Sequence, residues 1–172
     1  YAAVWMNSQG AVLKSTNGGQ SFFDPELPDA GPRRRSVWDV SVSRADANWL
    51  YTATTRGIFH SSNAGRTWEG YADEGVRETG CLSTFCTRGN VADGGKIPED
   101  GMNGQLPPVL HPKDPKIAFT QSYSTLVKTT DGGENWYYSS SGYGAAMRAG
   151  GRTSSAFLDD KTFAFFLTDH GP

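Results

Sequence analysis

One eight-residue pattern occurs three times in this chain of 172 residues and constrains its fold more than any other feature. The pattern reads Ser/Thr-x-Asp/Asn-x-Gly-x-x-aromatic and spans residues 15–22, 61–68 and 129–136. Its defining residues are Ser15, Asn17, Gly19, Phe22, Ser61, Asn63, Gly65, Trp68, Thr129, Asp131, Gly133 and Trp136. The closing aromatic residues lie 46 and then 68 residues apart, so the first interval matches one four-stranded repeat unit and the second matches such a unit with an insertion.

Short apolar segments flank each copy at matching offsets. Some lie directly before a copy, others about ten residues earlier, and a third group further upstream, with turn residues between the first two kinds. The segments are 11–13, 57–59 and 125–127, then 2–6, 50–54 and 117–121, then 37–42, 106–110 and 153–157, with a further one at 162–167. Together with a fourth strand that begins at the closing aromatic residue, they predict units of four antiparallel strands and an all-β fold.

The composition agrees with a turn-rich β protein. The chain has 21 glycines and 9 prolines, which interrupt regular structure often, and 12% aromatic residues, too many for a disordered chain. The net charge of −2 argues against binding of nucleic acid through overall electrostatic attraction. No apolar run reaches the roughly 18–20 residues of a membrane span. We therefore expect no nucleic-acid partner and no membrane insertion.

Each eight-residue copy has a structural interpretation. The Asp or Asn side chain is expected to accept a hydrogen bond from the backbone N–H two residues on and close a turn. Gly19, Gly65 and Gly133 can adopt the positive φ of such a turn, and the closing aromatic ring is expected to be buried between units. A metal-binding role is disfavoured because two of the three copies carry a neutral Asn, and no metal or other cofactor is expected.

With these features the three copies resemble the Asp-box (BNR) repeat, and the chain is similar to Asp-box β-propellers such as sialidases, xyloglucan hydrolases, sortilin-type receptors and photosystem assembly factors. The resemblance implies four-stranded antiparallel blades at about residues 1–24, 37–70, 104–139 and 152–172, with a long loop insertion at 71–104. Because propellers have roughly four to eight blades, the chain is expected to be part of one propeller domain, with about three and a half blades present and the remaining blades contributed by the same protein.

The resemblance is specific for the fold and leaves function open, since such propellers do unrelated things. The connections between blades are long and lie at the end opposite the repeats, where loops carry function most often. We expect a non-catalytic extracytoplasmic scaffold or recognition module for a protein partner or a polysaccharide. Its candidate binding residues are Arg33, Arg34, Arg35, Tyr71, Tyr143 and Arg148. A solvated loop is the simpler interpretation of the three consecutive arginines, and packing within the blades is the simpler role of most aromatic residues.

Two alternatives stay open. The first is a glycoside hydrolase acting on a glucan or xyloglucan, with a sialidase less favoured because the Phe-Arg-Ile-Pro type signature is missing. Such enzymes need two carboxyl groups about 5–10 Å apart, for which Asp39 and Asp100 are the candidates, although a cap and a turn are simpler roles for them. The second alternative is a cell-surface or virion assembly component.

The two cysteines, Cys81 and Cys86, are separated by four residues in a glycine-rich segment. With only two cysteines the chain cannot build a four-cysteine zinc site, so a disulfide is favoured over two free thiols. A disulfide indicates an oxidising compartment, and we expect an extracellular, periplasmic or cell-surface location.

Overall fold

The computed structural model describes residues 1–6, 9–25, 37–54, 57–72, 108–122, 125–139, 148–149, 155–165 and 167–168. All regular structure in these segments is β, as expected. The strands are β1 (Ala2–Met6), β2 (Gln9–Leu13), β3 (Val37–Val42), β4 (Leu50–Thr54), β5 (Gly57–Ser61), β6 (Glu69–Ala72), β7 (Val109–Leu110), β8 (Ala118–Ser122), β9 (Thr125–Thr129), β10 (Tyr137–Tyr138), β11 (Arg148–Ala149), β12 (Ser155–Phe157), β13 (Phe163–Phe165) and β14 (Leu167–Thr168). Across these ranges there is no helix long and apolar enough to cross a membrane.

Two of the sheets have four antiparallel strands each. One has the order β3-β4-β5-β6 and the other β7-β8-β9-β10, so that each is a meander in chain order. The fourth strand of each begins directly after Trp68 or Trp136, the closing aromatic residue of the preceding eight-residue copy. The four-stranded unit is therefore confirmed for these two copies.

The other sheets are smaller. β1 pairs with β2, β12 with β13, and β11 with β14. After the first copy, a single bridge between Lys14 and Phe23 stands where the other units have a fourth strand. The predicted strand at 162–167 is wrong as one element, because β13 and β14 pair with different partners. No sheet closes on itself among the residues described, and the blade ranges stay a prediction.

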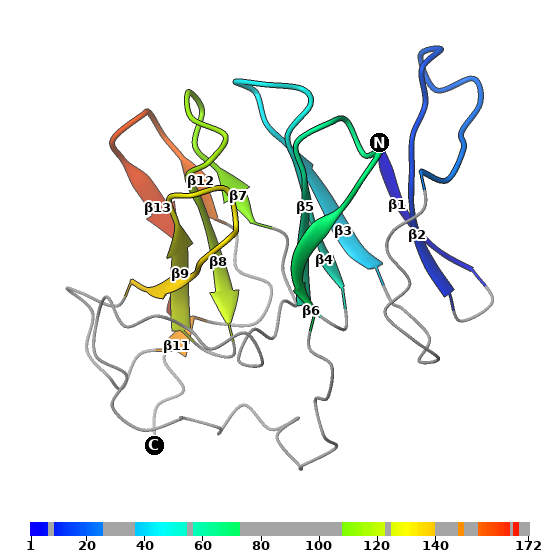
Figure 1. The fold of residues 1–172 in the computed structure, drawn as a ribbon. Coiled ribbons are helices and arrows are strands. Elements are labelled where there is room, and N and C mark those ends of the chain that lie inside the picture. Colours follow the sequence, from blue (N-terminus) through cyan, green and yellow to red (C-terminus); the bar gives the residue numbers. More distant parts are fainter. Residues whose placement is uncertain are drawn as a thin grey trace.

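Figure 1 shows the sheets side by side in chain order, from β1–β2 at one side to β12–β13 at the other. Two apolar clusters lie where neighbouring sheets meet. One joins β1–β2 to β3–β6 through Val12, Val37, Leu50, Phe59 and Trp68, and the other joins β3–β6 to β7–β10 through Tyr51, Ile58, Ala118, Val127 and Trp136. β4 contributes to both clusters and is buried along its whole length. The core thus lies between sheets.

The meander order assigns the turns to two ends. The three eight-residue copies, hereafter the boxes, lie at the same end as the turns 43–49 and 111–117, which is the upper end in Figure 1. The two kinds of turn are hydrogen-bonded to each other: Ala64 N donates to Asn48 O at 2.9 Å, and Gly132 N donates to Lys116 O at 3.0 Å. Connections from one sheet to the next leave from the opposite end.

Candidate functional site

The first hydroxyl of each box organises its turn. Ser61 Oγ accepts hydrogen bonds from the backbone N–H groups of Asn63 (3.3 Å) and Gly65 (2.9 Å) and donates to Asn63 Oδ1 at 3.0 Å. Ser15 and Thr129 make the same three bonds in their own boxes. Sequence reasoning missed this role, although a hydroxyl at this position in all three boxes was the available signal.

The Asp or Asn side chain closes a wider turn than expected. Its Oδ1 accepts from the backbone N–H four residues on, at 3.0 Å in Asn17, 2.9 Å in Asn63 and 2.9 Å in Asp131. The expectation of a bond two residues on is wrong because that N–H, on the box glycine, donates to the first hydroxyl instead. Two side chains therefore share the donors of one turn.

The side chain of the fourth residue after the Asp or Asn completes the hydrogen-bond network of the box, and it is a hydroxyl in the first two boxes and an amide in the third. Asn63 Nδ2 donates to Thr67 Oγ1 at 2.7 Å, and Asn17 makes the equivalent bond to a serine hydroxyl. In the third box the roles are exchanged, and Asn135 Nδ2 donates to Asp131 Oδ2 at 2.7 Å. Burial alone would raise the pKa of Asp131, but the hydrogen bonds from Asn135 and Thr129 outweigh it and the pKa is lowered.

The backbone of the boxes uses positive φ at two successive residues. Gly19, Gly65 and Gly133 have φ of +87°, +79° and +97°, as predicted. The preceding residue also has positive φ, and in the second box it is Ala64 at +60°. The carbonyl of Ala64 accepts hydrogen bonds from Tyr1 Oη (2.9 Å) and Lys14 Nζ (2.7 Å). This unfavourable alanine conformation is held by donors from the neighbouring sheet.

The closing aromatic residues differ in burial. Trp68 and Trp136 are 5% and 0% exposed, so the prediction of a buried ring is confirmed for them. Trp136 meets the ring of Tyr51, in the preceding sheet, edge-on at 6.4 Å between centroids. Phe22 is 47% exposed, so the prediction is wrong for it, because no described sheet lies against the ring as Tyr51 does against Trp136. Among the residues that the structure describes, neither indole N–H has a hydrogen-bond partner, and both rings are held by packing.

A cross-strand pair recurs on the face that each of three sheets turns toward the following sheet. Lys14 Nζ lies 5.5 Å from the Tyr1 ring centroid, and Lys128 Nζ lies 5.5 Å from that of Phe119. In the middle sheet Tyr51 pairs with His60, with ring centroids 5.9 Å apart. An aromatic ring beside a cation or an imidazole is thus a second repeated element, which sequence reasoning missed because its members are far apart in the chain.

The Tyr51–His60 pair is packed tightly against the third box. A Cβ added to Gly133 would lie 3.1 Å from the Tyr51 ring and 3.2 Å from His60 Nδ1. His60 also stacks on Trp49 at 5.9 Å. Burial raises the pKa of Tyr51, and the negative charges of Asp131 and Asp114 add to the rise. Burial lowers the pKa of His60, against the opposing charges of Glu69, Glu134 and Asp131. These groups serve as packing surfaces in uncharged form.

The structure describes only some of the residues of the site predicted from the long connections. Asp39 lies exposed in β3, where its Oδ1 accepts from its neighbour Val40 N at 2.7 Å, next to a bulge in the pairing with β4. Tyr71 and Arg148 are placed by their backbone in β6 and β11, which belong to different sheets. The remaining candidates lie outside the described residues: Arg33, Arg34, Arg35, Cys81, Cys86, Asp100 and Tyr143.

Comparison of the sequence with models of known protein families and with curated proteins found no match. The Asp-box resemblance therefore stays an interpretation of the repeats themselves. Within the described part of the chain, no group of three or more His, Cys, Asp or Glu side chains is arranged to hold a metal ion. These residues build two contacts between sheets, in each of which a box packs against the cross-strand pair of the preceding sheet.

Proposed function

We propose that this chain is part of an Asp-box β-propeller that acts as a non-catalytic extracytoplasmic scaffold or recognition module. The propeller assignment is supported by two four-stranded antiparallel meanders in which a box precedes the outermost strand. It is further supported by the placement of each box tryptophan between its own sheet and the one before it.

The observation that carries the function is how the box polar groups are used. The hydroxyl, the Asp or Asn side chain and the positive-φ carbonyl of Ala64 all bond within the turn or to the neighbouring sheet. Such residues stabilise the array and are already bonded internally, so recognition is assigned to the opposite end, where the connections between sheets are long. A polysaccharide or a protein partner would bind there, in an oxidising compartment if Cys81 and Cys86 are paired.

Calorimetric titration with xyloglucan oligosaccharides tests this proposal, alongside a reducing-sugar assay on the same samples. We expect binding without hydrolysis. Deletion of residues 82–98 should abolish binding while preserving the melting temperature, and Glu134→Gln, an exposed change at the box end, is the matched control. Absence of binding would reject glucan recognition.

A glycoside hydrolase is the second candidate, favoured by one observation. Asp39 presents an exposed carboxyl group beside a β-bulge, and bulges often lie next to active sites. Release of reducing sugar that disappears in Asp39→Asn or Asp100→Asn would establish this function and overturn the non-catalytic one.

A further inference from the structure

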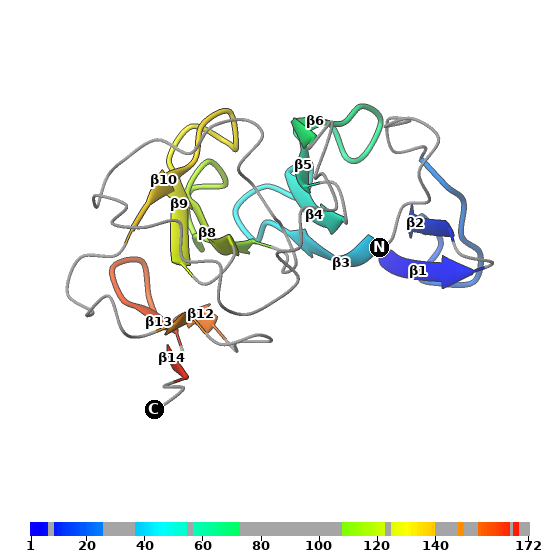
Figure 2. The ribbon, with the colours of Figure 1, turned by 90° about the horizontal axis from the view of Figure 1, so that it is seen from below.

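The residue directly before the first hydroxyl of a box differs in its chemistry among the three boxes. It is Lys14 in the first, His60 in the second and Lys128 in the third, and each lies beside an aromatic ring. A lysine keeps its charge between about pH 5 and 8, whereas the charge of a histidine changes in that range. His60 belongs to the sheet β3–β6, which lies between β1–β2 and β8–β10 in Figure 2. This middle position is therefore the one of the three that can respond to pH in this range.

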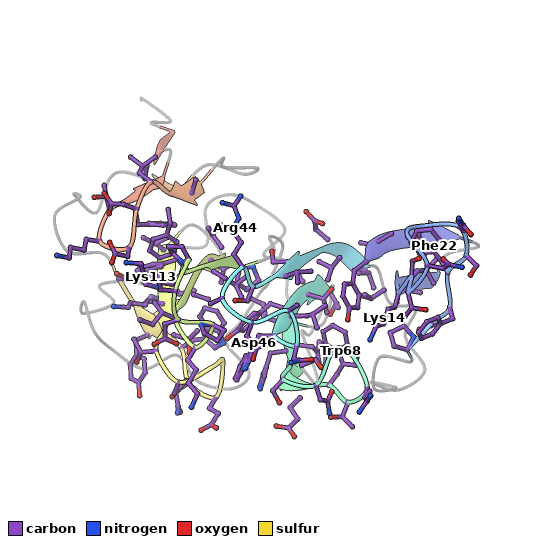
Figure 3. All side chains as sticks on the ribbon, turned by 90° about the horizontal axis from the view of Figure 1, so that it is seen from above. Lys14, Phe22, Arg44, Asp46, Trp68 and Lys113 are labelled. Carbon is purple, nitrogen blue, oxygen red and sulfur yellow. The ribbon has the colours of Figure 1, made fainter. Side chains whose placement is uncertain are left out.

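The lysine of the first box shows how a permanent charge is accommodated at this position. Lys14 Nζ lies 5.5 Å from the ring centroid of Tyr1 and donates a hydrogen bond to Ala64 O at 2.7 Å. Figure 3 labels Lys14 and Trp68 at this contact between the first two sheets. The long side chain carries the charge past the ring to a carbonyl oxygen of the next sheet.

The imidazole of His60 is shorter than a lysine side chain and is enclosed in the packing between β3–β6 and β7–β10. His60 is 8% exposed, and its ring centroid lies 5.9 Å from that of Trp49 and 5.9 Å from that of Tyr51. A Cβ added to Gly133 would lie 3.2 Å from His60 Nδ1, so the third box rests directly on the imidazole. A charge on a ring so enclosed is costly unless water reaches it, and separation of the two sheets would let water reach it.

The charged groups that face His60 are carboxylates. They are Glu69, directly opposite on β6, and Asp131 and Glu134 of the third box. Their negative charges favour protonation, but burial outweighs them and lowers the pKa of His60 below its ordinary value of 6.5. Glu69 and Glu134 are exposed, so water and salt screen their charges. The closed contact therefore binds this proton less readily than a state in which the imidazole is hydrated.

We propose that protonation of His60 separates the third box from the Tyr51–His60 pair, so that the contact between β3–β6 and β7–β10 opens as pH falls. Because folding lowers the pKa of His60, the stability of the contact is fully present above about pH 6.5 and is lost as pH falls below that value toward the folded pKa. The equilibrium constant for closing should fall by up to about tenfold per pH unit in this window, since the open state binds up to one more proton. Asp131, whose ordinary pKa is 3.8 and is lowered further by folding, stays charged throughout it.

NMR spectra of the 172-residue chain recorded between about pH 8 and 5 test the proposal. The chemical shifts of the His60 ring protons report protonation, and cross-peaks between the rings of Trp136 and Tyr51, whose centroids are 6.4 Å apart, report the contact. We expect these cross-peaks to disappear with the same midpoint at which His60 titrates. Cross-peaks between the Tyr1 ring and Gly65, where an added Cβ would lie 3.6 Å from that ring, should persist, because the contact between the first two sheets carries a lysine.

Two variants separate His60 from other titrating groups. His60→Gln removes the titrating imidazole, so its Trp136–Tyr51 cross-peaks should persist at pH 5. His111→Gln is the matched control, because it removes an imidazole from the turn 111–117 and should lose the cross-peaks as the wild type does.

The wild-type titration decides the proposal even if His60→Gln fails to form the contact at pH 8. Titration of His60 with the Trp136–Tyr51 cross-peaks unchanged would overturn the proposal, and so would cross-peaks that persist to pH 5 in the wild type. Loss of the cross-peaks in a folded His60→Gln at the same pH as in the wild type would show that another group controls the contact, and would overturn the proposal as well.

Discussion

Removing the first hydroxyl of a box tests how the turns are held. Thr129 is fully buried. Its Oγ1 accepts a hydrogen bond from Gly133 N at 3.0 Å and donates one to Asp131 Oδ1 at 2.8 Å. Thr129→Val keeps the shape of the side chain and removes these two bonds together with the one that Thr129 Oγ1 accepts from Asp131 N at 3.3 Å. The Gly133 N–H then has no acceptor in a buried position.

The magnitude follows from burial. An unsatisfied buried N–H costs about 1–3 kcal/mol, and the lost bond to the Asp131 carboxylate adds to that, so Thr129→Val should destabilise the protein by about 2–4 kcal/mol. In the first box, Ser15→Ala removes the equivalent bonds at an exposed turn, where water replaces the acceptor for Gly19 N–H. That change should cost only about 0.5–1 kcal/mol.

Urea unfolding followed by tryptophan fluorescence gives the free energies of unfolding. Thr130→Ala and Thr16→Ala are matched controls, because each removes the exposed hydroxyl next to the box hydroxyl and should change stability by no more than about 0.5 kcal/mol. Equal losses in Thr129→Val and Ser15→Ala would refute the argument that burial sets the strength of the network.

Four further predictions concern single positions. Trp68→Ala should cost about 3–5 kcal/mol, and an unchanged melting curve would contradict its packing between sheets. Ala64→Gly should leave the urea midpoint unchanged or raise it, because glycine accepts φ of +60° without the strain of about 1 kcal/mol; a clear loss would count against that conformation. Folding lowers the pKa of Asp131, so the stability that this carboxylate contributes is present above its unfolded pKa and is lost as pH falls through its folded pKa. Urea midpoints of the wild type measured from about pH 6 to 2 should therefore fall with pH, and Asp131→Asn should make this fall smaller. Thiol titration of denatured, unreduced protein should find Cys81 and Cys86 unreactive, and two reactive thiols would reject the disulfide.

Much of the strand arrangement could be predicted because three copies of one pattern can be aligned with each other. The segment 37–42 coincides with β3 and the segment 50–54 with β4. The positive φ of Gly133 was also predictable, since glycine is the residue that reaches this conformation at little cost.

The details of the boxes could not be predicted from residue types. A hydroxyl such as that of Thr129 has several possible partners in a turn. Only the folded structure shows that it accepts the hydrogen bond from the Gly133 N–H, which the sequence pattern assigned to Asp131. The exposure of Phe22 was equally hidden, because its place in the repeat does not say whether a sheet lies against it. Most of the residues proposed to bind a ligand lie outside the described segments, so their arrangement stays a prediction.

The central claim is that a box aromatic residue packs on the preceding sheet. Nuclear Overhauser spectra of protein labelled in its tryptophan and tyrosine rings test it most directly, since the rings of Trp136 and Tyr51 have centroids 6.4 Å apart in an edge-on arrangement. We predict cross-peaks between the indole protons of Trp136 and the ring protons of Tyr51. A well-dispersed spectrum in which Trp136 shows contacts only to its own sheet, such as to Val127, would contradict the account.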